Sequence, residues 1–169
     1  MKNKSVKKTA YMGLMLALSI ALSALEGMIP SVVAFPGIKL GLSNIVTMYC
    51  LFFMGAPHAF ILAALKSGFV LLTRGATAGM LSAAGGVSAV LVMLFMRRKR
   101  ATDAMTSISG AIAHNLAQLV AAWAFMRSGY ILYYAPLLII SGTIMGLITG
   151  FILKLVLPAL AKLGINIKE

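Results

Sequence analysis

Residues 78–100 read AGMLSAAGGVSAVLVMLFMRRKR, an apolar run as far as Met96 that is followed at once by four cations. A helix that spans a bilayer needs about 20 predominantly apolar residues. Arginine and lysine gather at the cytoplasmic ends of such helices. This stretch therefore predicts a transmembrane helix at about 78–96 that ends at the cytoplasmic surface.

The whole chain shares the character of this stretch. Of its 169 residues, 61% are hydrophobic and 11% are charged, and the mean hydropathy is +0.99. A soluble domain of this length could not cover so apolar a core with so few charges, whereas lipid solvates apolar faces directly. We therefore expect an all-α integral membrane protein with a single transmembrane domain over residues 1–169.

Apolar runs on both sides of 78–96 bring the expected number of transmembrane helices to six. Pro30 and Pro36 mark a loop after the first run, and Gly55-Ala56-Pro57 marks a turn after the second. The first run follows several lysines but is longer than the core of a signal peptide, so we expect it to be retained. The predicted helices lie at about 9–27, 38–54, 58–73, 78–96, 106–126 and 131–157.

The distribution of basic residues predicts the orientation. With the N-terminus inside, the lysines of the N-terminal tail, the cluster 97–100 and the lysines at the C-terminal end all lie on the cytoplasmic side. That cluster follows an even-numbered helix, as this orientation requires. The sequence thus predicts both ends in the cytoplasm and a multi-pass location in the bacterial cell membrane.

Several classes of function are excluded by what the sequence lacks. The net charge of +12 falls mainly at the ends of apolar runs, so we expect the lipid bilayer, and not nucleic acid, as its partner. One cysteine, Cys50, makes neither an internal disulfide nor a zinc site. The only acids are Glu26, Asp103 and Glu169, and there is no P-loop. We expect no metal, no cofactor, no catalytic residue and no enzymatic activity.

Polar side chains inside the predicted helices fall mostly in their outer half. Polar groups are costly in hydrocarbon, so each is a candidate functional residue. Lys66 lies near the middle of its helix, and Asn44 lies about 8 Å deeper than Lys39. The pattern favours a pocket open to the outside over a channel. The candidate substrate-binding residues are Glu26, Lys39, Asn44, Lys66, Arg74, Ser82, Gly85, Gly86, His114, Asn115 and Gln118.

The charges in this region predict the kind of ligand. Glu26 is the only acid there, against the three cations Lys39, Lys66 and Arg74. One salt bridge would leave about two cations without a partner, and a buried cation needs one. A small anion with a phosphate, diphosphate or carboxylate group would provide it.

Several candidates also have a purely structural interpretation. Glu26 with Lys39 fits an interfacial salt bridge, and the Lys66 side chain could extend toward the membrane surface. Arg74 fits a contact with lipid headgroups. His114 with Gln118 fits a hydrogen-bonded link between helices, as in other membrane bundles.

The first predicted helix carries small residues at every fourth position, Gly13, Ala17 and Ala21. Such a stripe lets another helix approach closely. It could pack within this protein or against a partner subunit.

Four segments of the chain resemble one bacterial family. They are EGMIP at 26–30, PGIKLGLSN at 36–44, SAAGGVS at 82–88 and HNLAQ at 114–118. Together they resemble the Gx transporter family, which is also labelled heptaprenyl diphosphate synthase component I, over roughly residues 9–157. That family is similar to the S-components of energy-coupling-factor (ECF) importers. The resemblance implies a six-helix bundle that binds a small ligand near the outer surface.

The resemblance also implies partners. S-components dock through small residues of their first helix onto a transmembrane subunit driven by two ATPases, and Gly13, Ala17 and Ala21 match that pattern. The second family label implies an alternative, a non-catalytic membrane component of heptaprenyl diphosphate synthase. Prenyl diphosphate synthases carry paired aspartate-rich motifs, which this chain lacks, so it would not be the catalytic subunit.

Overall fold

The computed structural model describes residues 2–28 and 42–162, with the side chains of 6–26, 28 and 42–155. Within these ranges the chain forms α-helices and one 3-10 helix and has no strand, so the all-α prediction is confirmed. The elements are α1 (Lys2–Met28), α2 (Ser43–Phe53), α3 (Ala56–Arg74), α4 (Ala76–Arg98), α5 (Asp103–Met126), η1 (Gly129–Tyr134) and α6 (Ala135–Lys162).

Five of the six described α-helices, all except α2, are long and apolar enough to cross a membrane, the last of them together with η1. These helices indicate a membrane-embedded protein. The exception has 11 residues, which gives a length of about 16 Å, about half the thickness of the hydrocarbon core. Of the span predicted at 38–54, residues 38–41 lie outside the described residues, and the helix itself begins at Ser43.

Glycine and proline set the limits of α3. Gly55 and Gly75, at its two ends, have φ of 90° and 89°, a conformation that other residues rarely adopt. Pro57 occupies the first turn, where a missing N–H costs nothing. Gly75 also precedes the first residue of α4, so a single residue turns the chain between two antiparallel helices.

Two predicted helices begin three or more residues too late because the prediction followed hydropathy alone. The helix predicted from Thr9 begins at Lys2, since lysine is a good helix former even outside an apolar run. The helix predicted from Thr106 begins at Asp103. The Thr102 hydroxyl accepts a hydrogen bond from the Met105 N–H at 3.2 Å, which caps this helix.

The last predicted span, 131–157, agrees within two residues with the apolar stretch Gly129–Leu155, which is long enough to cross a membrane, but it is not one continuous α-helix. Residues 129–134 form the 3-10 helix η1, and α6 begins at Ala135, with Pro136 in its first turn. The helix then continues past Pro158 to Lys162. A proline removes one helical hydrogen bond but does not by itself end a helix.

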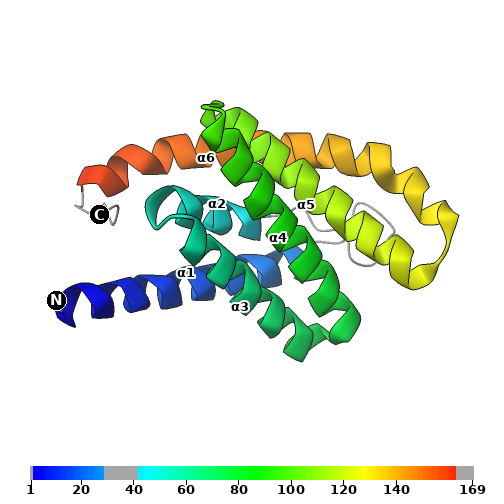
Figure 1. The fold of residues 1–169 in the computed structure, drawn as a ribbon, viewed down its shortest axis with the longest axis horizontal. Helices are drawn as coiled ribbons and strands as arrows, with labels where there is room; N and C mark the ends of the chain where they lie inside the picture. The colour runs from blue at the N-terminus through cyan, green and yellow to red at the C-terminus, as the bar shows by residue number, and fades with distance from the viewer. Residues whose placement is uncertain (1, 29–41, 163–169) are drawn as a thin grey trace.

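The helices form a bundle in which the N-terminal end of α1 and the C-terminal end of α6 lie on the same side of the molecule (Figure 1). The most extensive contacts join α3 with α4, α4 with α5, and α5 with α6. Helix α1 packs more sparsely, against α2 and α3. The 3-10 helix lies on the opposite side from the chain ends.

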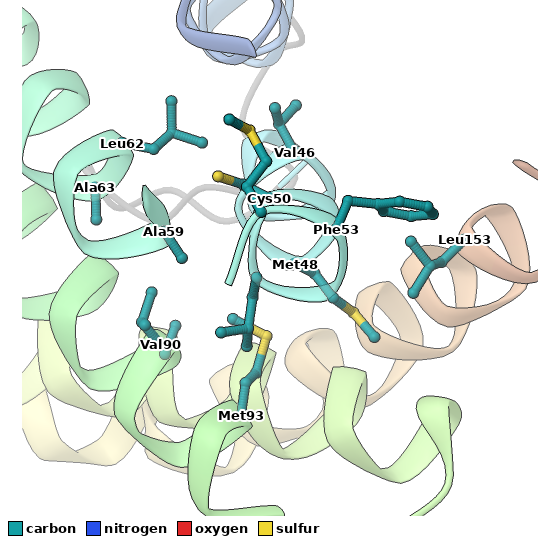
Figure 2. Packing of buried hydrophobic residues seen from close by; sticks show 13 residues of the cluster. Val46, Met48, Cys50, Phe53, Ala59, Leu62, Ala63, Val90, Met93 and Leu153 are labelled. Carbon is teal, nitrogen blue, oxygen red and sulfur yellow. The ribbon is translucent and has the colours of Figure 1, made fainter. Parts of the chain in front are cut away.

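The hydrophobic core is centred on α2. Its side chains point outward in several directions, toward Leu62 of α3, Met93 of α4 and Leu153 of α6 (Figure 2). Cys50 and Leu51 are fully buried. A helix that is apolar over most of its surface belongs in the interior, and α2 packs against α1, α3, α4 and α6.

Candidate functional site

Side chains from two other helices meet at the N-terminal end of α2. One carboxylate oxygen of Glu26 accepts a hydrogen bond from the Leu42 N–H at 3.2 Å. The Lys66 amino group donates to the Ser43 hydroxyl at 2.5 Å. Glu26 and Lys66 are only 6% and 7% exposed, so an acid and an amine are enclosed at the start of a buried helix.

This meeting point lies well inside the bundle. Lys66 precedes the end of α3 at Arg74 by eight residues, which corresponds to about 12 Å along the helix. The hydrogen bond between Lys66 and Ser43 places the N-terminus of α2 at the same level. The unpaired N–H groups of a helix N-terminus carry a partial positive charge. Helix N-termini within membrane proteins are therefore suited to anionic groups.

Helix α1 turns a polar face toward the interior near its C-terminal end. Ser19, Ser23 and Glu26 recur at helical spacing and are 0%, 5% and 6% exposed. The backbone carbonyl of Ser23 accepts a hydrogen bond of 3.2 Å from the guanidinium of Arg74. Arg74, itself exposed, thus joins the end of α3 to α1.

The predicted polar stretch of α4 faces α3 and α5. The Ser67 hydroxyl donates to the Ala63 carbonyl at 2.7 Å and contacts the Ser82 hydroxyl at 3.4 Å. One turn along α4, Gly86 packs on Ala63, because an added Cβ would lie 3.3 Å from the Ala63 Cβ. Small residues here bring the α3 and α4 backbones close together.

Gly85 makes room for two of the predicted residues of α5. A Cβ at this position would lie 2.8 Å from His114 Cε1 and 2.9 Å from Gln118 Cγ. Real Cβ atoms do not approach other atoms so closely, so any other residue would displace the imidazole. His114 is 3% exposed, and its buried position depends on this glycine.

Asn115 connects α5 to α6. Its side-chain amide donates to the Leu138 carbonyl at 3.0 Å and to the Ser141 hydroxyl at 3.3 Å. The Ser141 hydroxyl also donates to the Leu138 carbonyl, at 3.1 Å. Asn115 is 3% exposed, and these contacts make it a hydrogen-bonded link between α5 and α6, a structural role that the sequence suggests for His114 with Gln118 instead.

The predicted residues thus gather in two groups within the bundle. Glu26, Asn44 and Lys66 are buried around the N-terminus of α2, and Gly85 brings His114 and Gln118 together between α4 and α5. The Ser67–Ser82 contact joins α3, which carries Lys66 of the first group, to α4, which carries Gly85 of the second group. Lys39 lies outside the described residues.

Sequence reasoning missed several buried hydroxyl groups of this interior, because serine and threonine are common in membrane helices and lower the hydropathy little. Spacing could have found part of them, since two lie one and two turns before Glu26 on the same helical face. The missed hydroxyl groups are those of the buried residues Ser19, Ser23, Ser43, Thr47 and Ser67 and of the half-buried Ser141.

The small residues of α1 point away from this interior. Gly13, Ala17 and Ala21 are all exposed, and an added Cβ on Gly13 would meet nothing within 4 Å. Leu14 and Leu18 are 60% and 46% exposed beside them. Within the described residues, this stripe therefore does not serve packing inside the chain.

A separate depression of about 560 Å³ lies where α5 passes into η1. Aromatic and apolar side chains dominate its lining, which contains none of the predicted binding residues. It is lined by Met126, Ser128, Tyr130, Ile131, Tyr133 and Tyr134. No group of three or more His, Cys, Asp or Glu side chains that could hold a metal occurs among the described residues.

Apolar helices around a buried polar interior indicate a helical membrane protein. Its sequence matches the family described as "Heptaprenyl diphosphate synthase component I" over residues 15–156. Because the match covers most of the chain, the protein belongs to this family, as the four sequence segments predicted. Neither the curated proteins nor the solved structures contain a match.

Proposed function

We propose that this protein is the substrate-binding membrane subunit of an ATP-driven importer, similar to the S-components of ECF importers. It captures a small anionic metabolite from the outer side of the bacterial cell membrane. In this proposal the chain crosses the membrane six times with both ends inside. Five crossings are the long helices, and the remaining one contains α2.

The observation that carries the proposal is the position of Lys66 beside the N-terminus of α2. Its amino group is buried at mid-bundle depth and donates to Ser43, the first residue of that helix. A buried amine and a helix N-terminus both favour an anion. A polar centre of this kind inside a membrane protein is costly unless it serves a ligand or a structural link.

The other buried polar groups supply directed hydrogen bonds for such a ligand. His114 and Gln118 lie against the Gly85 backbone, and Ser82 contacts Ser67 across the α3–α4 interface. Small-ligand sites combine a mostly apolar wall with a few polar groups of this kind. Phosphate, diphosphate and carboxylate are the ligand groups that match an amine with hydroxyl and amide donors.

The energy for import would come from partner subunits. The sequence has no P-loop, so ATP hydrolysis requires other chains. The exposed stripe of Gly13, Ala17 and Ala21 is the surface we assign to the transmembrane partner. Small residues there allow the close approach of helices that membrane interfaces use.

Native mass spectrometry of the full-length protein, gently extracted from its own membrane, tests this proposal. We expect a co-purified small anion that is lost in the Lys66→Ala/Arg74→Ala variant. The control variant Arg127→Ala/Lys154→Ala, which removes two exposed cations elsewhere, should keep it. A wild-type protein without an anion, or equal retention in both variants, would contradict the proposal.

The family description favours a second candidate function, a non-catalytic membrane component of heptaprenyl diphosphate synthase. With three acidic residues in all, the chain has no paired aspartate-rich motifs for catalysis. The exposed cations of the α4–α5 turn, Arg98, Lys99 and Arg100, are available to an acidic soluble partner. Stable co-purification of a soluble prenyl diphosphate synthase subunit, with no bound anion, would favour this function over import.

A further inference from the structure

Of the four cations at the end of α4, Arg97 has a structural role within the bundle, and the other three lie on its surface. The Arg97 guanidinium donates to the Leu51 carbonyl at 2.8 Å and lies 4.4 Å from the centre of the Phe52 ring. It therefore caps the C-terminal end of α2, where carbonyl groups lack helical partners. Arg98, Lys99 and Arg100 are exposed.

The turn that carries these three cations is compact. The Lys99 and Arg100 N–H groups bond back to the Phe95 and Arg97 carbonyls, and Arg100 adopts a φ of 56°. Asp103, at the start of α5, is the only acid of the turn. Three exposed positive charges are thus held close together at the junction of two apolar helices long enough to span a membrane.

An exposed apolar stripe leads along α4 to this cluster. Leu91, Phe95 and Lys99 follow one another at four-residue spacing, so they lie along one face of the helix. Leu91 and Phe95 are 53% and 54% exposed. The Lys99 amino group lies 5.7 Å from the centre of the Phe95 ring. The Lys99 amino group therefore lies on the same face of α4 as the exposed side chains of Leu91 and Phe95.

We propose that this surface, formed by Leu91, Phe95 and the cations 98–100, binds an anionic phospholipid. One acyl chain lies along Leu91 and Phe95, and the headgroup phosphate is bound by Lys99 with Arg98 and Arg100. Guanidinium and ammonium groups are the usual partners of phosphate in proteins. Cationic clusters at the end of a membrane helix attract anionic lipids in this way.

The direction of Lys99 favours a lipid over an acidic protein. A soluble partner would meet cations that extend away from the membrane. Lys99 instead turns back over Phe95, whose exposed ring lies on a face that lipid would cover. A molecule that has an apolar chain to cover the Phe95 ring and a negative charge to bind the Lys99 amino group fits both observations. This proposal is independent of whether the protein imports a metabolite.

The test is native mass spectrometry of the full-length, delipidated protein titrated with dioleoyl phosphatidylglycerol or dioleoyl phosphatidylcholine. Each basic residue near an anionic headgroup changes affinity roughly fivefold, so Arg98→Gln/Lys99→Gln/Arg100→Gln should weaken phosphatidylglycerol binding on the order of 100-fold. Phosphatidylcholine binding should change little. Phe95→Ala should weaken both lipids by a few fold, because it removes apolar contact.

The Lys7→Gln/Lys8→Gln variant is the control, since it removes cations from the N-terminal end of another helix. It should keep the preference for phosphatidylglycerol. Equal loss in this control, or unchanged binding in the triple variant, would overturn the proposal. Effective competition by inorganic phosphate would assign the site to free anions. Loss of a soluble acidic partner without loss of lipid would assign it to a protein.

Discussion

Helices α1 and α6 carry the same sequence signal and use it in opposite ways. In α6, Gly142, Gly146 and Gly150 face α5, and an added Cβ on any of them would come within 3.2 Å of its backbone. In α1, Gly13, Ala17 and Ala21 are exposed, and Gly13 has nothing near it. A small-residue stripe predicts close helix packing, but only the structure tells whether the partner helix belongs to the same chain.

The two helices are also held in place differently. α6 is joined to α5 by backbone approach along its length and by Asn115, which bonds the Leu138 carbonyl. Near its C-terminal end, α1 is held by polar contacts, from Glu26 to the Leu42 N–H and from Arg74 to the Ser23 carbonyl. We infer that α6 belongs to the fixed part of the bundle, whereas α1 can be loosened without unfolding the rest.

The largest effect is expected for Gly146→Leu. A Cβ at this position would lie 2.5 Å from the Ile108 Cα, so α6 must separate from α5. Overpacking of this kind costs about 1–3 kcal/mol, and the larger side chain should exceed that range. Reversible unfolding in mixed micelles measures the free energy of unfolding. Gly68→Ala, whose added Cβ meets nothing within 4 Å, is the control. Equal stability of the two variants would show that α5 and α6 are not in close contact.

A smaller effect is expected for Glu26→Ala. Loss of a hydrogen bond to a charged group costs about 1.5–3 kcal/mol, and here it removes a contact that holds the C-terminal end of α1 in place. The sole cysteine reports displacement of α1 as a whole, because the Cys50 Sγ is buried 3.9 Å from the Met12 Sδ, which lies 14 residues before Glu26 on that helix. Maleimide labelling of Cys50 should become faster in Glu26→Ala and stay unchanged in Asp103→Ala. Slow labelling in both variants would mean that Glu26 does not hold α1 in place.

Gly85→Ala should lower the free energy of unfolding only slightly but should clearly weaken anion binding. The new Cβ would meet side-chain atoms of His114 and Gln118, which can shift, so we expect a loss of about 1 kcal/mol. The displaced imidazole should nevertheless weaken retention of the co-purified anion. Gly86→Ala, which would meet only the Ala63 Cβ at 3.3 Å, is the matched control. Equal anion retention in the two variants would remove His114 from the proposed site.

Gly13→Leu should have the smallest effect on the isolated chain. The position is exposed, and leucine favours a helix over glycine by up to about 1 kcal/mol, so stability should be unchanged or slightly higher. The same unfolding measurement as for Gly146→Leu makes the two stripes directly comparable. A loss as large as that of Gly146→Leu would mean that the stripe on α1 packs inside the protein.

Hydropathy predicted the helices well because a bilayer requires long apolar runs, as at 78–96. It could not predict that α2 would be a short helix at the centre of the core, since an apolar window has the same composition whether it spans or is enclosed. Capping residues such as Thr102 and glycines such as Gly75 determine where the helices begin and end. Of the site, charge identified Lys66 and Glu26, but the partner Ser43 has no signal of its own in the sequence.

The stripe on α6 was present in the sequence and was not singled out. Gly142, Gly146 and Gly150 repeat at four-residue spacing as clearly as the small residues of α1. The contacts of Gly85 could not be predicted, because a glycine in a helix shows nothing of the side chain that lies against it. Pairing across helices depends on tertiary structure, which periodicity does not encode.

The most direct test of the proposed importer subunit measures partner binding through α1 and anion binding inside the bundle in the same experiment. Wild-type and Gly13→Leu proteins are purified gently from their own membrane, and co-purified proteins and small anions are quantified by mass spectrometry. We predict that Gly13→Leu loses an ATPase-containing membrane partner and keeps its bound anion. Retention of the same partner in both proteins, or a wild type that carries only a soluble prenyl diphosphate synthase subunit, would contradict the proposal.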